Sequence, residues 1–123
     1  MDEASPDSRE SARMTARELL EAAAKAAGIV GEVEEFYMKL GDKTPILAVS
    51  TGRDVWDPLN DDGDALRLAV RLKLTISPYQ EGVFVSRYEG EEVVAEPFEV
   101  IGVPDCAATR RAIVRAAAAV VPE

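Results

Sequence analysis

Hydrophobic side chains recur along this chain with two periods, and the changes between them predict its elements. From residue 15 to residue 27 the period is that of a helix with one buried face. Thr15 and Glu18 have the spacing of a capping box, and Gly28 is a natural stop. The expected buried stripe consists of Leu19, Leu20, Ala23, Ala24 and Ala27. We therefore expect a first helix over 15–27.

The stretch 56–72 carries the strongest pattern, and we expect the rest of the chain to be organised around it. Asp61 and Asp62 can accept hydrogen bonds from the free amides of a first helical turn, and Asp64 suits the positive end of the helix dipole. Arg67 and Arg71 share the opposite face of the helix, which we expect to be a narrow strip exposed to solvent. The apolar positions are Ala65, Leu68, Ala69 and Leu72, widened by Leu66 and Val70. This pattern predicts a helix that is nearly encircled by core.

Between and after these helices the period changes to two, which is typical of strands. Alternation predicts one hairpin from strands at 33–40 and 46–51, with a turn at 41–43. A second hairpin is predicted from strands at 83–88 and 93–100, with a turn at 89–91. Pro97 weakens the end of the last strand and suggests an edge or a bulge.

A final helix is expected from Asp105, which can cap it, to about Val121. Its buried stripe would be Ile113, Ala116, Ala117, Val120 and Val121, with Arg111 and Arg115 outside. The element order is then α-ββ-α-ββ-α, in one domain over 13–123 after a disordered acidic tail at 1–12. Two hairpins joined by a helix favour an α+β fold with one four-stranded antiparallel sheet packed with three helices, like a sandwich.

The chain has a net charge of −9 at pH 7, and most of the excess acid lies on the expected hairpins and tail. This charge argues against nucleic acid and anionic membranes as partners, because phosphates bind clustered Lys and Arg. It favours a partner protein with a basic surface. The candidate docking residues are Glu34, Glu35, Glu91, Glu92 and Glu96, together with Trp56, the only tryptophan. Trp56 can equally be a hydrophobic staple ahead of its helix.

Catalytic side chains are scarce, so we expect neither an enzyme nor a cofactor. The chain has no histidine, and its single cysteine, Cys106, is interpreted as a small hydrophobe packed against the sheet. One alternative is a metal-dependent enzyme with ligands among Asp57, Asp61, Asp62 and Asp64. The calcium-loop register fails there, however, because Pro58 and Ala69 occupy ligand positions. Capping and solubility explain these aspartates more simply.

Arg110, Arg111 and Arg115 could form a basic patch, but we interpret them as the solvated face of the last helix. No apolar run approaches eighteen residues and the N-terminus lacks an apolar signal core, so a cytoplasmic protein is expected. The lone cysteine fits a reducing compartment.

Three motifs, at 15–29, 56–69 and 106–118, resemble small proteins of tailed bacteriophages and prophages, in or close to the phage ABA-sandwich family. The central motif reads Trp-Asp-Pro-Leu-Asn-Asp-Asp-Gly-Asp-Ala-Leu-Arg-Leu-Ala. The resemblance implies a small α+β domain made in the cytoplasm of an infected bacterium, and it brings no catalytic residues. It suggests an accessory protein that binds a host or phage protein and inhibits a defence or regulatory factor. The other alternative is a self-associating assembly module, such as a homodimer, that pairs through an exposed edge of the fourth strand.

Overall fold

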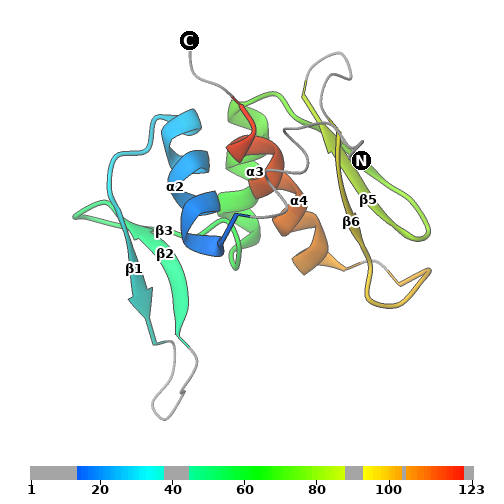
Figure 1. Cartoon of the computed structure of the whole chain (residues 1–123), viewed down its shortest axis with the longest axis horizontal. Coiled ribbons are helices and arrows are strands. Elements are labelled where there is room, and N and C mark those ends of the chain that lie inside the picture. The colour runs from blue at the N-terminus through cyan, green and yellow to red at the C-terminus, as the bar shows by residue number, and fades with distance from the viewer. Residues whose placement is uncertain (1–13, 38–44, 88–92, 104, 121–123) are drawn as a thin grey trace, which may run out of the picture.

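The computed structural model describes residues 14–37, 45–87, 93–103 and 105–120, and its helices lie between two sheets (Figure 1). The helices are α2 (Ala16–Ala27), α3 (Asp62–Arg71) and α4 (Cys106–Ala118). The N-terminal sheet consists of β1 (Glu32–Phe36), β2 (Ile46–Ser50) and β3 (Val55–Trp56). The C-terminal sheet consists of β4 (Thr75–Pro78), β5 (Gly82–Ser86) and β6 (Val93–Pro97). Among the described helices, none combines the length and hydrophobicity needed to cross a membrane.

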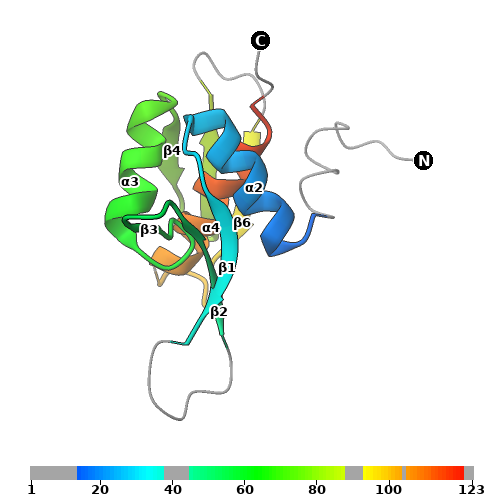
Figure 2. The same cartoon turned by 90° about the vertical axis from the view of Figure 1, so that its left-hand side faces the viewer.

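The expected α+β class is confirmed, but the single four-stranded sheet is wrong. Each hairpin has a third antiparallel strand, because β3 follows β2 and β4 precedes β5. β3 has only two residues and β4 has four, so neither is long enough to show a clear alternation. The hairpins do not join because α2 packs on β1 and β2 while α4 packs on β5 and β6. Figure 2 shows the N-terminal sheet nearest the viewer with the helices behind it.

The first helix forms as its end signals predict. Thr15 accepts a hydrogen bond from the Glu18 amide at 3.1 Å, and the Glu18 carboxylate accepts one from the Thr15 amide at 2.9 Å. Gly28 ends the helix with a φ of 75°, a left-handed conformation that glycine adopts without strain. The capping box and the glycine stop are therefore both confirmed.

The organising element is α4, and the prediction that the segment 56–72 holds this place is wrong. α4 contacts both other helices and two strands of the C-terminal sheet. Ala108, Ala112, Val114 and Ala117 are fully buried, and such small side chains let neighbouring backbones approach closely. α3 buries one stripe only, because Leu66 and Val70 are 59% and 69% exposed. It is not encircled by core.

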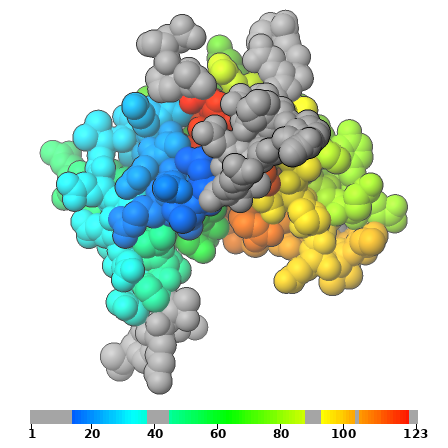
Figure 3. Space-filling view, viewed as in Figure 1, coloured from blue at the N-terminus to red at the C-terminus, as the bar shows by residue number. Residues whose placement is uncertain are grey.

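The core has two parts of unequal size. The larger part joins α4, α3 and the inner face of the C-terminal sheet, including Val83, Val85 and Val94. The smaller part holds α2 against the N-terminal sheet and consists of Leu20, Ala24, Val33 and Val49. Ile29, Trp56 and Leu59 pack against both parts. The two sheets are therefore linked through the helices and these three side chains. On the surface, the residues of the N-terminal sheet (cyan to green) and those of the C-terminal sheet (yellow-green to yellow) lie on opposite sides of the molecule (Figure 3).

One edge strand of each sheet has features that hinder further strand pairing. Pro97 ends β6, which lies at an edge of its sheet, so the expectation of an edge position is confirmed. Arg115 donates from Nη1 to the Ala95 carbonyl of this strand at 3.0 Å. On the other sheet, Arg17 donates from Nη1 to the Val33 carbonyl of β1 at 3.1 Å. Helix arginines thus occupy a carbonyl on each of these edge strands.

Candidate functional site

A groove of about 660 Å³ lies where β3 leads into α3, and it gathers more acidic side chains than basic ones. We call it the acidic groove. Its lining residues are Ile29, Thr51, Asp54, Val55, Trp56, Asp57, Asp61, Asp64 and Arg67. The sequence motif that opens with Trp56 therefore contributes five of the nine lining residues.

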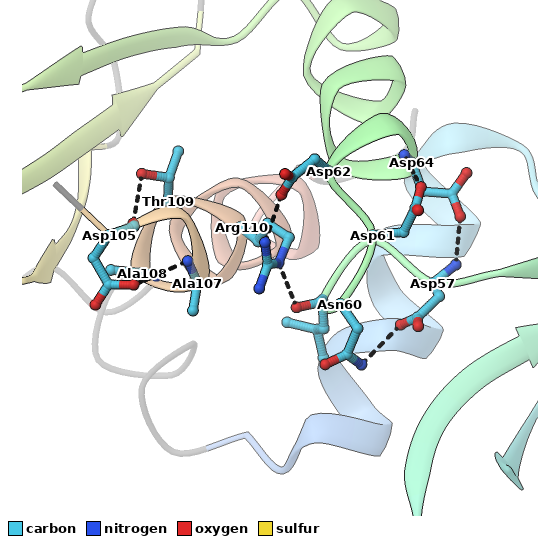
Figure 4. Close-up of polar contacts among 11 residues, drawn as sticks. Asp57, Asn60, Asp61, Asp62, Asp64, Asp105, Ala107, Ala108, Thr109 and Arg110 are labelled. Atoms are coloured by element: carbon cyan, nitrogen blue, oxygen red, sulfur yellow. Dashed lines mark hydrogen bonds and ion pairs between the residues drawn. The ribbon is translucent and has the colours of Figure 1, made fainter. Parts of the chain in front are cut away.

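Hydrogen bonds made by its own side chains hold the segment from Asp57 to Asp64 in place (Figure 4). Asp61 caps α3 by accepting a hydrogen bond from the Asp64 amide at 2.8 Å. Asp64 accepts from the Asp57 amide at 2.9 Å, and Asn60 donates to the Asp57 carboxylate at 3.0 Å. This confirms the predicted capping role of Asp61 and fixes three carboxylates in one place.

Arg110 of α4 fastens the same segment from the opposite side (Figure 4). Its Nε donates to the Leu59 carbonyl at 2.9 Å, and its Nη1 forms an ion pair with Asp62. Asp62 therefore pairs with Arg110 and does not line the acidic groove. The prediction that Arg110 belongs to a solvated face is wrong, because only 19% of its side chain is exposed.

Charge within the acidic groove is only partly balanced. Arg67 donates to Asp64 at 2.7 Å and lies 3.9 Å from Asp61, and its hydrogen bond to the Asp64 carboxylate raises the pKa of Arg67. Burial raises the pKa of Asp57, opposed by its hydrogen bonds with Asn60 and assisted by repulsion from Asp64 and Asp61. The groove thus concentrates negative charge around a partly buried carboxylate.

Trp56 has a structural role and also borders the acidic groove. It lies opposite Val49 in the N-terminal sheet and packs against both parts of the core. The staple interpretation fits this packing, and the partner-anchor interpretation fits its place in the groove wall. One rigidly held indole can serve both roles.

The metal alternative finds little geometric support. Asp57, Asp61 and Asp64 come together, but each is already committed to backbone or side-chain hydrogen bonds, and Asp62 pairs with Arg110. Among the described residues, no group of three or more Cys, Asp or Glu side chains is arranged to hold a metal ion.

Those predicted acidic docking residues that the structure describes do not form one surface. Glu34 and Glu35 are exposed on β1, but alternate residues of a strand point to opposite faces. Glu96 lies on the other sheet, is 15% exposed, and pairs with Arg115 at 2.8 Å and Arg111 at 3.2 Å. Two helix arginines therefore already hold the Glu96 carboxylate, and its role in docking stays a prediction. Glu91 and Glu92 lie outside the described residues.

Two further predictions about α4 need correction. Cys106 is exposed at the first position of the helix and does not pack against the sheet. Arg115 is not on an outside face, because its side chain is 14% exposed and it bonds to Glu96 and to the Ala95 carbonyl. Neither contact leaves a signal in the sequence, since the partners are 19 and 20 residues away.

A comparison of the chain with protein-family models, curated proteins and solved structures found no match.

Proposed function

We propose that this chain is a non-catalytic protein-binding module that holds a basic segment of a partner protein in the acidic groove. The observation that carries the proposal is the charge of the lining, with four aspartates against one arginine. Arg67 pairs with Asp64 and approaches Asp61, which leaves Asp54 and Asp57 without a cation in the lining. A Lys or Arg side chain of a partner would balance this excess.

The apolar part of the groove suits the same kind of partner. Ile29, Val55 and Trp56 line it beside the aspartates, and Val55 is 48% exposed. Lys and Arg side chains have apolar stems that pack along such surfaces, and their cations favour an indole face. The groove therefore offers contacts for both ends of a basic side chain.

The setting that we propose is the cytoplasm of an infected bacterium, where the chain would act as a bacteriophage accessory protein on a host or phage protein. The support is the resemblance of the motifs at 15–29, 56–69 and 106–118 to phage proteins. A defence or regulatory factor of the host with a basic surface is the proposed target.

Self-association through a strand edge is less well supported than binding to another protein. Arg115 occupies the Ala95 carbonyl at the edge of β6, and Pro97 lacks an amide hydrogen there. A second copy would also bring another charge of −9 to the contact.

The test uses the fluorescence of Trp56, the only tryptophan, during titration with a deca-lysine peptide. We expect saturable binding that weakens with added salt, and an Asp54→Asn variant should bind about threefold more weakly. Asp54 is exposed, and it bonds to the Thr51 hydroxyl through its own backbone amide and carbonyl, so changing its side chain should leave the fold intact.

The matched control is Glu34→Gln, which removes one exposed carboxylate from β1 outside the groove lining. Its affinity should stay within about 1.5-fold of the parent, as expected for screened surface charges. Equal weakening by both variants would point to non-specific attraction by net charge and would contradict the proposal.

A further inference from the structure

In the described strands of the C-terminal sheet, no charged residue occupies an outward-pointing position, although 30% of the chain is charged. Val83, Val85 and Val94 point inward to the core, so the alternate positions of the three strands point outward. The outward positions, continued by Tyr79 at the turn, are Thr75, Ser77, Tyr79, Phe84, Ser86, Val93, Ala95 and Pro97. We call this surface the neutral face.

Large apolar side chains stand on the neutral face in contact with solvent. Tyr79, Phe84 and Val93 are 56%, 36% and 46% exposed. The rings of Tyr79 and Phe84 meet edge to face with centroids 5.1 Å apart. Such a pair is already ordered before binding, so a partner would lose little side-chain entropy in contacting it.

The strand edges beside this face are poor sites for adding another strand. Phe98 donates to the Glu81 carbonyl at 3.0 Å and so continues the hydrogen-bonded pairs between β5 and β6. Hydrogen-bonded and non-hydrogen-bonded pairs alternate along antiparallel strands, so the backbone polar groups of Ala95 and Pro97 point away from β5. The Ala95 carbonyl already accepts a hydrogen bond from Arg115, and Pro97 has no amide hydrogen to donate. A partner that uses this sheet must therefore lie on its face.

The opposite edge strand of this sheet, β4, also carries a proline where a backbone donor would be needed. Tyr79 donates to the Gly82 carbonyl at 2.7 Å and so forms a hydrogen-bonded pair with β5. The neighbouring pair, Pro78 with Val83, is then not hydrogen-bonded, and the backbone nitrogen of Pro78 points away from β5. Proline offers no donor there. Strand addition is disfavoured on both sides of the neutral face.

The size of the neutral face selects one kind of partner. Three strands spaced about 4.8 Å apart, with about 3.3 Å per residue, give a footprint on the order of 200 Å². A stable dimer needs about 800 Å² from each copy, so a second copy of this chain is a poor occupant. One helix is about 10 Å wide, and ten residues of it span about 15 Å, which matches the face.

A loop at one end of the sheet extends the apolar surface. Val100, Ile101 and Val103 are 59%, 73% and 54% exposed. The loop is held beside the β4–β5 turn, because Gly102 donates to the Gln80 carbonyl at 2.8 Å (Figure 1). These side chains could contact the end of a helix lying on the sheet.

We propose that the neutral face binds a single amphipathic helix of a partner protein through the apolar stripe of that helix. A sheet covered by helices on both faces is a common layered arrangement. Among the helices that the structure describes, α4 packs on the inner face of this sheet, and none packs on the outer face. This binding surface is separate from the acidic groove and does not depend on it.

The test is a selection on the full chain with a displayed library of amphipathic helical peptides about 20 residues long. Phe84→Glu should weaken the selected helices by about tenfold or more, because it places a charge at the centre of the contact. Val30→Glu is the matched control, since Val30 is 86% exposed in the loop before β1, and it should leave affinity within about twofold.

A second variant, Ser77→Glu, changes a position paired with Phe84 and keeps the test decisive if Phe84→Glu does not fold. The proposal is overturned if the library yields no binder, or if the selected helices bind both variants as tightly as the parent. It is also overturned if sedimentation shows a dimer that Phe84→Glu abolishes, because the face would then belong to a second copy.

Discussion

The two sheets have the same chain order but are stabilised differently and present different surfaces. The N-terminal sheet is held by a small core beneath α2 and carries Glu32 and Glu34 on its outer side. The C-terminal sheet packs on α4 in the larger core, and the outward positions of its described strands are uncharged. The same three-stranded topology therefore supports an acidic region next to one sheet and a neutral binding surface on the other.

The largest expected effect is a selective loss of the N-terminal sheet when its small core is damaged. Leu20 is fully buried there, and Leu20→Ala should cost about 3 kcal/mol of the free energy of unfolding. Amide hydrogen exchange should accelerate first in β1 and β2, because fewer buried side chains hold them.

The matched variant is Val85→Ala in the larger core, where Val85 is also fully buried. We expect a loss of about 2 kcal/mol in the free energy of unfolding, with faster amide exchange in β4–β6. Urea unfolding measures the loss of stability in both variants. Uniform acceleration throughout the chain in both variants would mean that the two sheets do not differ in local stability.

A smaller loss of stability is expected where Arg115 of α4 bonds to the edge strand β6. Arg115→Met removes the bonds to Glu96 and to the Ala95 carbonyl from a side chain that is only 14% exposed. We expect a loss of about 2 kcal/mol, since a buried charge is left less well paired and a carbonyl loses its donor.

Arg111→Met is the control for that experiment, because Arg111 pairs with the same carboxylate but is 47% exposed. Its cost should be about 0.5 kcal/mol, as for solvent-screened pairs. Equal costs in thermal or urea unfolding would show that edge capping by Arg115 contributes nothing.

The smallest effect concerns Asp57 in the acidic groove. Burial raises its pKa above the ordinary value of 3.8, so the folded state binds its proton more tightly than the unfolded state. The stability from this group is complete below the ordinary pKa and is lost as the pH rises through the raised pKa. Asp57→Asn should therefore be more stable than the parent at neutral pH, by about 0.5 kcal/mol or less because solvent screens the site.

The two proteins should converge in stability below pH 3.8, where the carboxyl group is protonated in both folded and unfolded states. Unfolding free energies measured from pH 3 to pH 7 test this difference. A gap that stays constant over the range would assign the effect to altered hydrogen bonding with Asn60.

The acidic groove was only partly predictable from the sequence. The clustering of Asp57, Asp61 and Asp64 follows from their spacing around a helix start, and the capping by Asp61 confirms it. The participation of Asp54 and Ile29 could not be read from the motif, because β3 turns back along β2 before α3 begins. The neutral face needed the registers of three strands, including β4, which no alternation had indicated.

The sequence by itself determined where α2, α3 and α4 begin, where α2 ends, and that β1 pairs with β2 and β5 with β6. Thr15 with Glu18, Gly28, Asp61 and Asp105 act through hydrogen bonds to neighbours within four residues, so their effects are readable in short windows. Only the tertiary structure decided that α4 is central, that there are two sheets, and that Arg110 and Arg115 point inward. Those outcomes depend on pairs such as Arg110 with Asp62, which are 48 residues apart, and on how closely alanine-rich helices can approach.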